Sequence, residues 1–206
     1  MPSREDRLIF LGDYIDRGPE SARVIEMLLS LVYSGYNVVA LRGNHEQMLL
    51  DSLADDYALT IWKLNSARKT LNSYGLEGDF AKCKTLASIF PAEHLTFLNE
   101  MPIHYRLSEK LWFVHGGIKF PNETMQSNEY LWLRPWEFVD SIPSDSMVIH
   151  GHTPIPIWEV ERQVELFSRE VNLDSGCVHL GLKEGLGYLS CLKLEERQLY
   201  YAKNME

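Results

Sequence analysis

Short apolar runs recur along this chain, and several of them end in a polar motif flanked by glycine. These runs cover residues 7–11, 37–41, 110–114 and 146–149. Short apolar stretches bounded by glycine and polar residues are typical of buried β-strands. In open α/β sheets, sites form outside the carboxyl ends of the strands. The pattern therefore predicts that the polar motifs converge at one place.

The pattern changes to a helical period between the first two runs. Pro19 is well placed to open a helix, and Gly35 closes it. The apolar stripe between them consists of Val24, Ile25, Leu28, Leu29 and Val32. Residues 7–41 are therefore predicted to form a β-α-β unit with parallel strands.

The rest of the chain divides into a helical part and a β-rich part. Residues 45–100 favour helices, ending with a short helix over residues 92–100 after Pro91. Residues 103–107 and 111–114 are expected to form a hairpin, and later strands are expected at 171–173, 187–194 and 198–201. Mixed parallel and antiparallel signals predict an α/β fold in which two mixed sheets pack face to face with helices outside.

Composition narrows the class of protein. A chain of 206 residues fits one domain, residues 1–206, with a full core. The net charge of −9 argues against nucleic acid or an anionic membrane as a general partner. No apolar run is long enough to cross a bilayer, and none near Met1 resembles an export signal. Cys83, Cys177 and Cys191 lack C-x-x-C spacing, so we expect buried free thiols and a cytoplasmic protein. The sequence makes no prediction of oligomeric state.

The polar motifs carry the candidate chemistry. They are GDYIDRG at residues 12–18, GNHE at 43–46, HGG at 115–117 and HGHT at 150–153. Their carboxylate, amide and imidazole groups together make a ligand set for a divalent metal. The adjacent glycines let the backbone approach a ligand closely. We therefore expect a metal-dependent hydrolase.

With these motifs in this order, the chain resembles the phosphoprotein phosphatase branch of the calcineurin-like metallophosphoesterases. The likeness is to the compact bacterial and phage serine/threonine protein phosphatases, and it runs from residue 7 to about 195. It implies a layered α/β/β/α sandwich. The family opens with a strand ending in GDxHG, which is not found before Leu8. We therefore expect an N-terminally incomplete domain that lacks a first βα unit of roughly thirty residues.

The resemblance also implies a cofactor and its ligands. The complete family site holds two divalent metal ions, with manganese expected first and iron or zinc as alternatives. Asp13 would bridge both ions, and Asn44, His115 and His152 would complete the shell of the second. The remaining ligands of the first ion belong to the motif that is not found. We therefore expect weak metal binding and impaired turnover in this chain. For Asp13 taken alone, a role in the turn is the alternative.

Four further residues match catalytic positions of the family. Arg17 and Arg134 match the arginines that clamp phosphate, although for Arg134 a surface salt bridge is the alternative. His45 resembles the general acid, and Asp16 would fix its tautomer and keep it protonated. Glu46 is expected to fix the loop or favour the helix N-terminus.

Other histidines and tryptophans are expected to have structural roles. His94 is expected to be exposed, His104 to be structural, and His150 to support the site from behind without binding metal. The tryptophans are expected to pack in the core or at the rim of the site, with no role in stacking on bases: Trp132, Trp136 and Trp158.

The expected function is therefore a serine/threonine protein phosphatase that acts on a phosphoprotein or phosphopeptide. Asp16 within GDYIDRG and the ending of GNHE favour this assignment. Two alternatives stay open. One is a symmetric dinucleoside tetraphosphatase, which acts on dinucleoside polyphosphates. The other is a phosphoprotein-binding remnant without catalysis.

Overall fold

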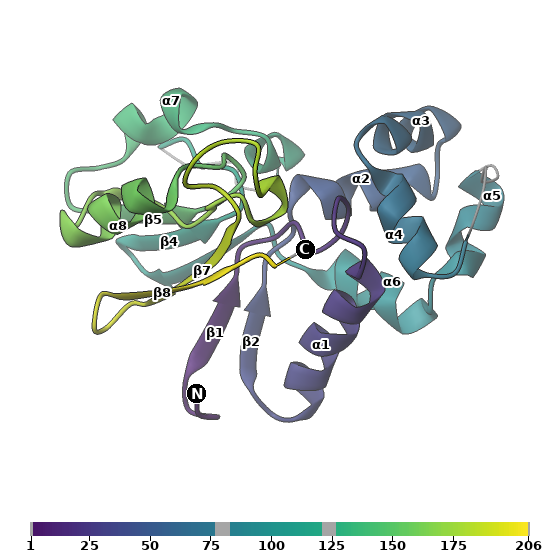
Figure 1. The fold of residues 1–206 in the computed structure, drawn as a ribbon, viewed down its shortest axis with the longest axis horizontal. Coiled ribbons are helices and arrows are strands. Elements are labelled where there is room, and N and C mark those ends of the chain that lie inside the picture. The colour runs from purple at the N-terminus through teal and green to yellow at the C-terminus, as the bar shows by residue number, and fades with distance from the viewer. Residues whose placement is uncertain (1, 77–82, 121–126, 206) are drawn as a thin grey trace. The chain divides into compact units, whose positions relative to one another are not determined.

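The structure is a computed structural model that describes residues 2–76, 83–120 and 127–205. It comprises two compact units, Met1–Pro102 and Ile103–Glu206. In Figure 1 the first unit runs from purple to teal and the second from teal to yellow. Two of the motifs, GDYIDRG and GNHE, lie in the first unit, and HGG and HGHT lie in the second.

The first unit begins with a β-α-β arrangement. Its elements are β1 (Arg7–Phe10), α1 (Ser21–Tyr33) and β2 (Asn37–Ala40). The strands pair in parallel, with Arg7 opposite Asn37, and α1 contacts β2 (Figure 1). Helix α1 buries Ile25, Leu28 and Leu29 of the predicted stripe. The predicted β-α-β unit is therefore confirmed.

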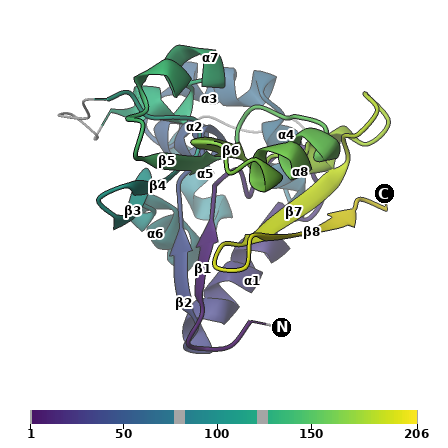
Figure 2. The ribbon, with the colours of Figure 1, turned by 90° about the vertical axis from the view of Figure 1, so that its left-hand side faces the viewer.

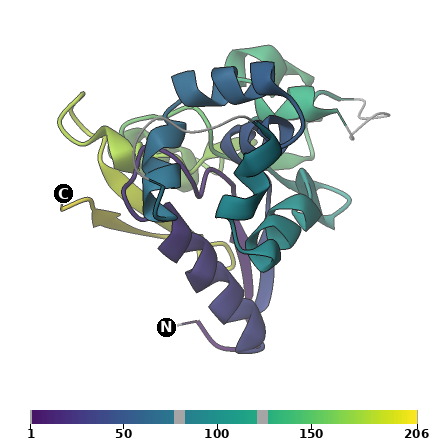
Figure 3. The ribbon, with the colours of Figure 1, turned by 90° about the vertical axis from the view of Figure 1, so that its right-hand side faces the viewer.

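Helices occupy the rest of this unit, and Figure 3 looks onto them. They are α2 (Asn44–Ser52), α3 (Asp56–Leu64), α4 (Ala67–Ser73), α5 (Cys83–Leu86), η1 (Ala87–Ile89) and α6 (Ala92–Glu100). Their core includes Leu49, Trp62, Leu71 and Leu98, all fully buried. The helical character predicted for residues 45–100 is confirmed in the described part of this range, residues 77–82 lying outside it, and α6 has the predicted bounds.

The second unit is built on a four-stranded mixed sheet (Figure 2). Its strands are β3 (His104–Ser108), β4 (Leu111–Val114), β5 (Met147–His150) and β6 (Glu170–Asn172), in that spatial order. Strands β3 and β4 form the predicted antiparallel hairpin, while β4, β5 and β6 run parallel. Because β4 and β5 are parallel neighbours, their carboxyl ends bring HGG and HGHT to the same edge of the sheet.

Short helices and a second hairpin complete this unit. They are η2 (Asn128–Leu131), α7 (Pro135–Phe138), η3 (Val139–Ser141), α8 (Ile157–Glu165), η4 (Cys177–His179), β7 (Tyr188–Lys193) and β8 (Gln198–Lys203). Strands β7 and β8 pair antiparallel, and α8 contacts β6. Parallel and antiparallel strands together with helices confirm the predicted α/β class. In the described residues the mixed sheet is β3 to β6, and the other sheets are two-stranded.

Several predictions of burial were wrong. His94 is only 5% exposed, because its ring packs edge-on against Tyr74 and its Nδ1 lies 2.9 Å from the Tyr74 hydroxyl. All three cysteines are free as expected, but only Cys83 is buried.

No helix in the described ranges has both the length and the apolar character needed to span a membrane.

None of the three tryptophans lies in the core, which leaves the rim as the alternative of the prediction, and the ring of Trp132 lies 6.1 Å from the ring of His152. The exposed fractions are 46% for Trp132, 68% for Trp136 and 49% for Trp158. Trp132 directly follows η2, Trp136 lies in α7 and Trp158 lies in α8.

Candidate functional site

The turn after β1 presents the side chains of the first motif from an unusual backbone. Asp13 has φ 59°, Asp16 has φ 70° and Arg17 has φ 59°. Positive φ is uncommon for residues other than glycine, and each instance costs about 1–3 kcal/mol unless the surroundings enforce it. The rest of the unit must therefore hold this turn in place.

Glu46 supplies much of that restraint. Its Oε2 accepts hydrogen bonds from the backbone N–H groups of Asp13 at 2.9 Å and Gly43 at 2.8 Å. Its Oε1 accepts one from the N–H of Tyr14 at 2.8 Å. The side chain is fully buried. Glu46 thus ties the GDYIDRG turn to the start of α2, in agreement with the structural role expected for it.

The glycine of GNHE allows a close approach between the two motifs. A Cβ atom on Gly43 would lie 2.3 Å from Oδ1 of Asp13 and 2.5 Å from its backbone nitrogen. Asn44 begins α2 and is buried, and the backbone N–H of His45 donates to Oδ1 of Asp13 at 3.3 Å. The structure therefore brings Asp13 to the segment that carries Asn44 and His45, more than thirty positions along the chain.

Asp16 and His45 form a buried carboxylate–imidazole pair in the first unit. Nδ1 of His45 lies 2.6 Å from Oδ2 of Asp16, and both side chains are almost fully buried. Burial lowers the pKa of His45, but the hydrogen bond to Asp16 and the charges of Asp13 and Asp16 outweigh it, so the pKa lies above its ordinary value. Because Nδ1 donates to Asp16, Nε2 is the nitrogen left to give a proton elsewhere.

Two residues that the sequence analysis did not single out also hold Asp16. Trp62 of α3 donates from Nε1 to Oδ2 of Asp16 at 2.9 Å. Thr70 of α4 donates from Oγ1 to Oδ1 of Asp16 at 2.5 Å. Neither residue lies in a motif. A tryptophan and a threonine within predicted helices give no sequence signal that they will hydrogen-bond to Asp16.

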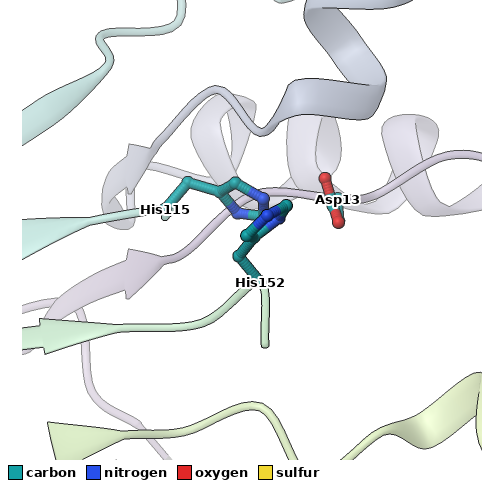
Figure 4. A group of neighbouring side chains, drawn as sticks. All are labelled: Asp13, His115 and His152. Atoms are coloured by element: carbon teal, nitrogen blue, oxygen red, sulfur yellow. The ribbon is translucent and has the colours of Figure 1, made fainter. Parts of the chain in front are cut away.

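In the second unit, the two predicted histidine ligands lie side by side. His115 follows β4 and His152 follows β5, and the N–H of Gly151 donates to the carbonyl of His115 at 2.9 Å. Their rings are 5.1 Å apart at 66°, edge to face, and each offers a nitrogen within 4.8 Å of the other (Figure 4, which also labels Asp13 of the first unit). Two imidazole nitrogens at this separation can bind one metal ion.

His150 supports this loop. Its Nε2 lies 2.6 Å from Oε1 of Glu170, and its Nδ1 lies 2.9 Å from the carbonyl of Gly151. Asn172 donates from Nδ2 to the carbonyl of Thr153 at 2.7 Å, which fixes the other side of the turn. Both nitrogens of the His150 ring face acceptors, so both are engaged in holding the loop in place.

The two predicted phosphate-binding arginines lie in different surroundings. Arg17 is exposed at the end of the first motif, and its charge lowers the pKa of nearby His45, as the smallest of the contributions. Arg134 is half-buried, with Nη1 3.5 Å from Oγ1 of Thr153 and its guanidinium over the ring of Trp136 at 5.7 Å. Arg134 therefore lies beside the loop that carries His152.

The donor types in both units suit a divalent transition metal. Asp13 and Asn44 offer oxygen in the first unit, and His115 and His152 offer nitrogen in the second. The carboxylate of Asp13 packs so closely against Gly43 that a Cβ atom at position 43 would displace it. Oxygen and imidazole donors without thiolate fit manganese, iron or zinc.

Comparison with known proteins places the chain among phosphohydrolases. The profile of the calcineurin-like phosphoesterases matches residues 2–186. The bis(5'-nucleosyl)-tetraphosphatase PrpE (asymmetrical) of Bacillus mycoides strain KBAB4 is 26% identical over 203 residues, covering 88% of this chain and 75% of the relative. The protein of the same name from Bacillus cereus strain B4264 is 25% identical over the same shares.

Two solved structures have a similar fold. One chain, provisionally assigned as a diadenosine tetraphosphatase, superposes with a TM-score of 0.63 at 18% identity, covering 98% of this chain and 82% of that one. The protein PH1004 from Pyrococcus horikoshii OT3 superposes with a TM-score of 0.50 at 16% identity, covering 95% and 73%. At these identities the likeness concerns the fold alone.

Proposed function

Since this chain belongs to the calcineurin-like phosphoesterase family, we propose that it hydrolyses phosphate esters or anhydrides and that His45 protonates the leaving group. The observation that carries this proposal is the buried pair of Asp16 and His45, with Nδ1 and Oδ2 2.6 Å apart. A carboxylate that holds one imidazole nitrogen keeps the other ready to donate a proton.

The cofactor would be divalent metal, with manganese as the first candidate. Asp13, Asn44, His115 and His152 would hold it; this assignment rests on the order of the motifs and on the donor types. Bound divalent metal polarises the phosphoryl group and lowers the pKa of a water molecule.

The chain's own residues would then do two things, stabilising charge and supplying a proton. Arg17 and Arg134 would stabilise the charge on the phosphoryl oxygens, a use for which the guanidinium fork is suited. Water oxygen bonds to phosphorus, and the bond to the leaving oxygen breaks with its electron pair on that oxygen. Nε2 of His45 gives this oxygen a proton, and the proton released by the water restores His45. One water is consumed for each bond cleaved.

A phosphorylated serine or threonine is the first substrate candidate, because of the proton donor. The alkoxide that leaves from such a residue is strongly basic, so its departure depends on protonation. The hydrogen bond to Asp16 raises the pKa of His45 above its ordinary value, which favours the protonated ring that could supply that proton.

A dinucleoside tetraphosphate is the second candidate, because the relatives in Bacillus carry that activity in their names. Their names specify asymmetrical cleavage, which separates a nucleoside monophosphate from a nucleoside triphosphate. The symmetric alternative would give two nucleoside diphosphates. The nucleotide that leaves is a weak base and depends less on a proton donor.

One experiment tests the function and separates the candidates. The purified chain is incubated with Mn²⁺ and either a phosphoserine peptide or diadenosine tetraphosphate, and the products are resolved by chromatography. Free phosphate from the peptide supports the first candidate. AMP with ATP supports asymmetrical cleavage, and ADP alone supports symmetric cleavage. Binding of the peptide with no turnover of either substrate would overturn the proposal in favour of a binding module.

A further inference from the structure

We propose that Trp62 and Thr70 are positioning residues that hold Asp16, and through it the ring of His45, in the orientation needed to protonate the leaving group. This inference rests on the proposed function. It assigns a role to α3 and α4, which lie outside all the motifs.

The geometry around Asp16 carries the inference. Oδ2 accepts from Nδ1 of His45 at 2.6 Å and from Nε1 of Trp62 at 2.9 Å, while Oδ1 accepts from Oγ1 of Thr70 at 2.5 Å. The backbone N–H of Asp16 also points to Oγ1 of Thr70 at 2.8 Å and to Oγ of Ser21 at 3.2 Å. Both carboxylate oxygens and the amide of one residue are therefore held at once.

Burial makes these contacts specific. Trp62 and Thr70 are fully buried, His45 is 1% exposed and Asp16 is 5% exposed. A buried carboxylate that lost one of these donors would have little water to replace it and would turn toward other donors. Such a turn would move Oδ2 away from Nδ1 of His45 and leave the imidazole free to rotate.

Asp16 needs this support because its own backbone does not favour the arrangement. Its φ of 70° lies in the left-handed region, which is uncommon for residues other than glycine and costs energy that surrounding contacts must offset. Ser21 at the start of α1 and Thr70 in α4 both contact its amide, and their hydroxyl oxygens lie 3.3 Å apart. The two helices thus meet at this residue, and the packing of the unit sets the position of the proton donor.

A purely structural role for Trp62 and Thr70 predicts something different. It predicts that their replacement lowers stability and, through partial unfolding, lowers turnover of every substrate equally. A positioning role predicts a loss that grows as the leaving group becomes more basic, because only then does turnover depend on the proton from His45. The dependence on leaving group is therefore the readout that separates the two.

The test compares phenyl phosphate, whose phenoxide leaving group is the more basic, with p-nitrophenyl phosphate, whose leaving group is less basic. Thr70→Val keeps the shape of the side chain and removes its hydroxyl. We expect kcat on phenyl phosphate to fall about tenfold, with a clearly smaller fall on p-nitrophenyl phosphate and little change in KM. Thr70→Ser restores the hydroxyl and should restore kcat. Trp62→Phe, which removes the indole N–H, should repeat the pattern of Thr70→Val.

Ser52→Ala is the matched control. Ser52 is also a fully buried hydroxyl in this unit, but it donates to the carbonyl of Leu49 and not to Asp16. We expect Ser52→Ala to change kcat on the two substrates by the same factor. Equal losses on both substrates in Thr70→Val and Trp62→Phe, or no loss, would overturn the inference.

A measurement on the protein without substrate keeps the inference independent of activity. The Nδ1 proton of His45 should give a downfield NMR resonance that is protected from exchange by the bond to Asp16. It should persist in Thr70→Ser and Ser52→Ala and weaken in Thr70→Val. If the unaltered chain hydrolyses no phosphate ester, the proposed function fails while this resonance still tests the positioning role. A resonance unchanged in Thr70→Val would overturn it.

Discussion

A Cβ atom on Gly43 would lie 2.3 Å from Oδ1 of Asp13, closer than real side-chain contacts allow. The same Cβ would lie 2.7 Å from Oε2 of Glu46, the group that ties the two motifs together. The absence of a side chain at Gly43 therefore allows the carboxylate of Asp13 to pack against the GNHE segment.

Gly43→Ala should accordingly displace Asp13 and lower both stability and metal binding. Overpacking of this kind typically costs about 1–3 kcal/mol. Denaturant unfolding and elemental analysis of the purified variant measure the two effects. Gly18→Ala is the control, because a Cβ there would meet its nearest atom only at 3.9 Å. Equal stability and metal content in the two variants would contradict the steric argument.

Part of this cluster could be predicted from the sequence. Parallel strands place their carboxyl ends at one edge, so the pairing of β1 with β2 brings Asp13 to the segment of Asn44 and His45. The same reasoning brings His115 to His152 at the ends of β4 and β5. In both cases glycine-flanked motifs marked the strand ends.

The contacts made by helices could not be predicted in this way. Trp62 and Thr70 reach Asp16 because of how α3 and α4 pack, and periodicity identifies the buried face of a helix but not what that face meets. His94 was wrongly expected to be exposed for the same reason. Its partner, Tyr74, lies at the end of α4, twenty positions away. Tertiary packing decides such cases, and a single sequence does not report it.

Glu46→Gln should destabilise the first unit more than an ordinary surface change. The carboxylate accepts from the N–H groups of Asp13, Tyr14 and Gly43 while fully buried, and an amide offers one oxygen in place of two. Leaving a buried donor unsatisfied costs about 1–3 kcal/mol. Urea unfolding measures it. Glu20→Gln, which removes an exposed pair with Arg23, should cost less than about 1 kcal/mol. A Glu46→Gln protein as stable as the Glu20→Gln control would show that the turn holds itself.

His152→Ala should remove metal that depends on the imidazole pair. His115 and His152 offer nitrogens within 4.8 Å of each other, and a single imidazole binds far more weakly than two. Elemental analysis after dialysis against Mn²⁺ gives the metal content of each variant. His179→Ala is the control, since His179 lies in η4 outside the motifs. Metal content equal to that of the unaltered chain would remove His152 from the ligand set.

The stability of the chain should depend on pH through His94. Burial lowers the pKa of His94 below its ordinary value of about 6.5, although the charges of Glu26 and Glu93 oppose this. Between the lowered folded pKa and 6.5, the unfolded chain binds more protons than the folded one. The contribution of His94 is therefore fully present above about pH 6.5 and is lost as pH falls through the folded pKa.

His94→Gln removes this titration, so its unfolding free energy should fall less steeply with acid than that of the unaltered chain. Burial also lowers the pKa of His104, so some of the slope should remain in the variant. Urea unfolding at a series of pH values from neutral downward gives both slopes. Identical slopes for the two proteins would show that His94 keeps its ordinary pKa in the fold.

Arg17→Ala should slow hydrolysis without removing metal or unfolding the chain. Arg17 is exposed at the end of GDYIDRG, so its loss leaves no cavity, while a missing positive charge at a developing anion typically costs about a hundredfold to a thousandfold in rate. Arg17→Lys keeps the charge without the planar fork, and its rate should lie between that of the unaltered chain and that of Arg17→Ala.

Arg23→Ala controls for the loss of general positive charge, because Arg23 is an exposed arginine paired with Glu20 in the same unit. The measurement is kcat/KM at saturating Mn²⁺, with metal content determined on the same samples. If Arg17→Ala and Arg23→Ala hydrolyse phosphate esters equally fast, the phosphoryl oxygens are stabilised by other groups, and Arg134 beside Thr153 becomes the arginine to replace next.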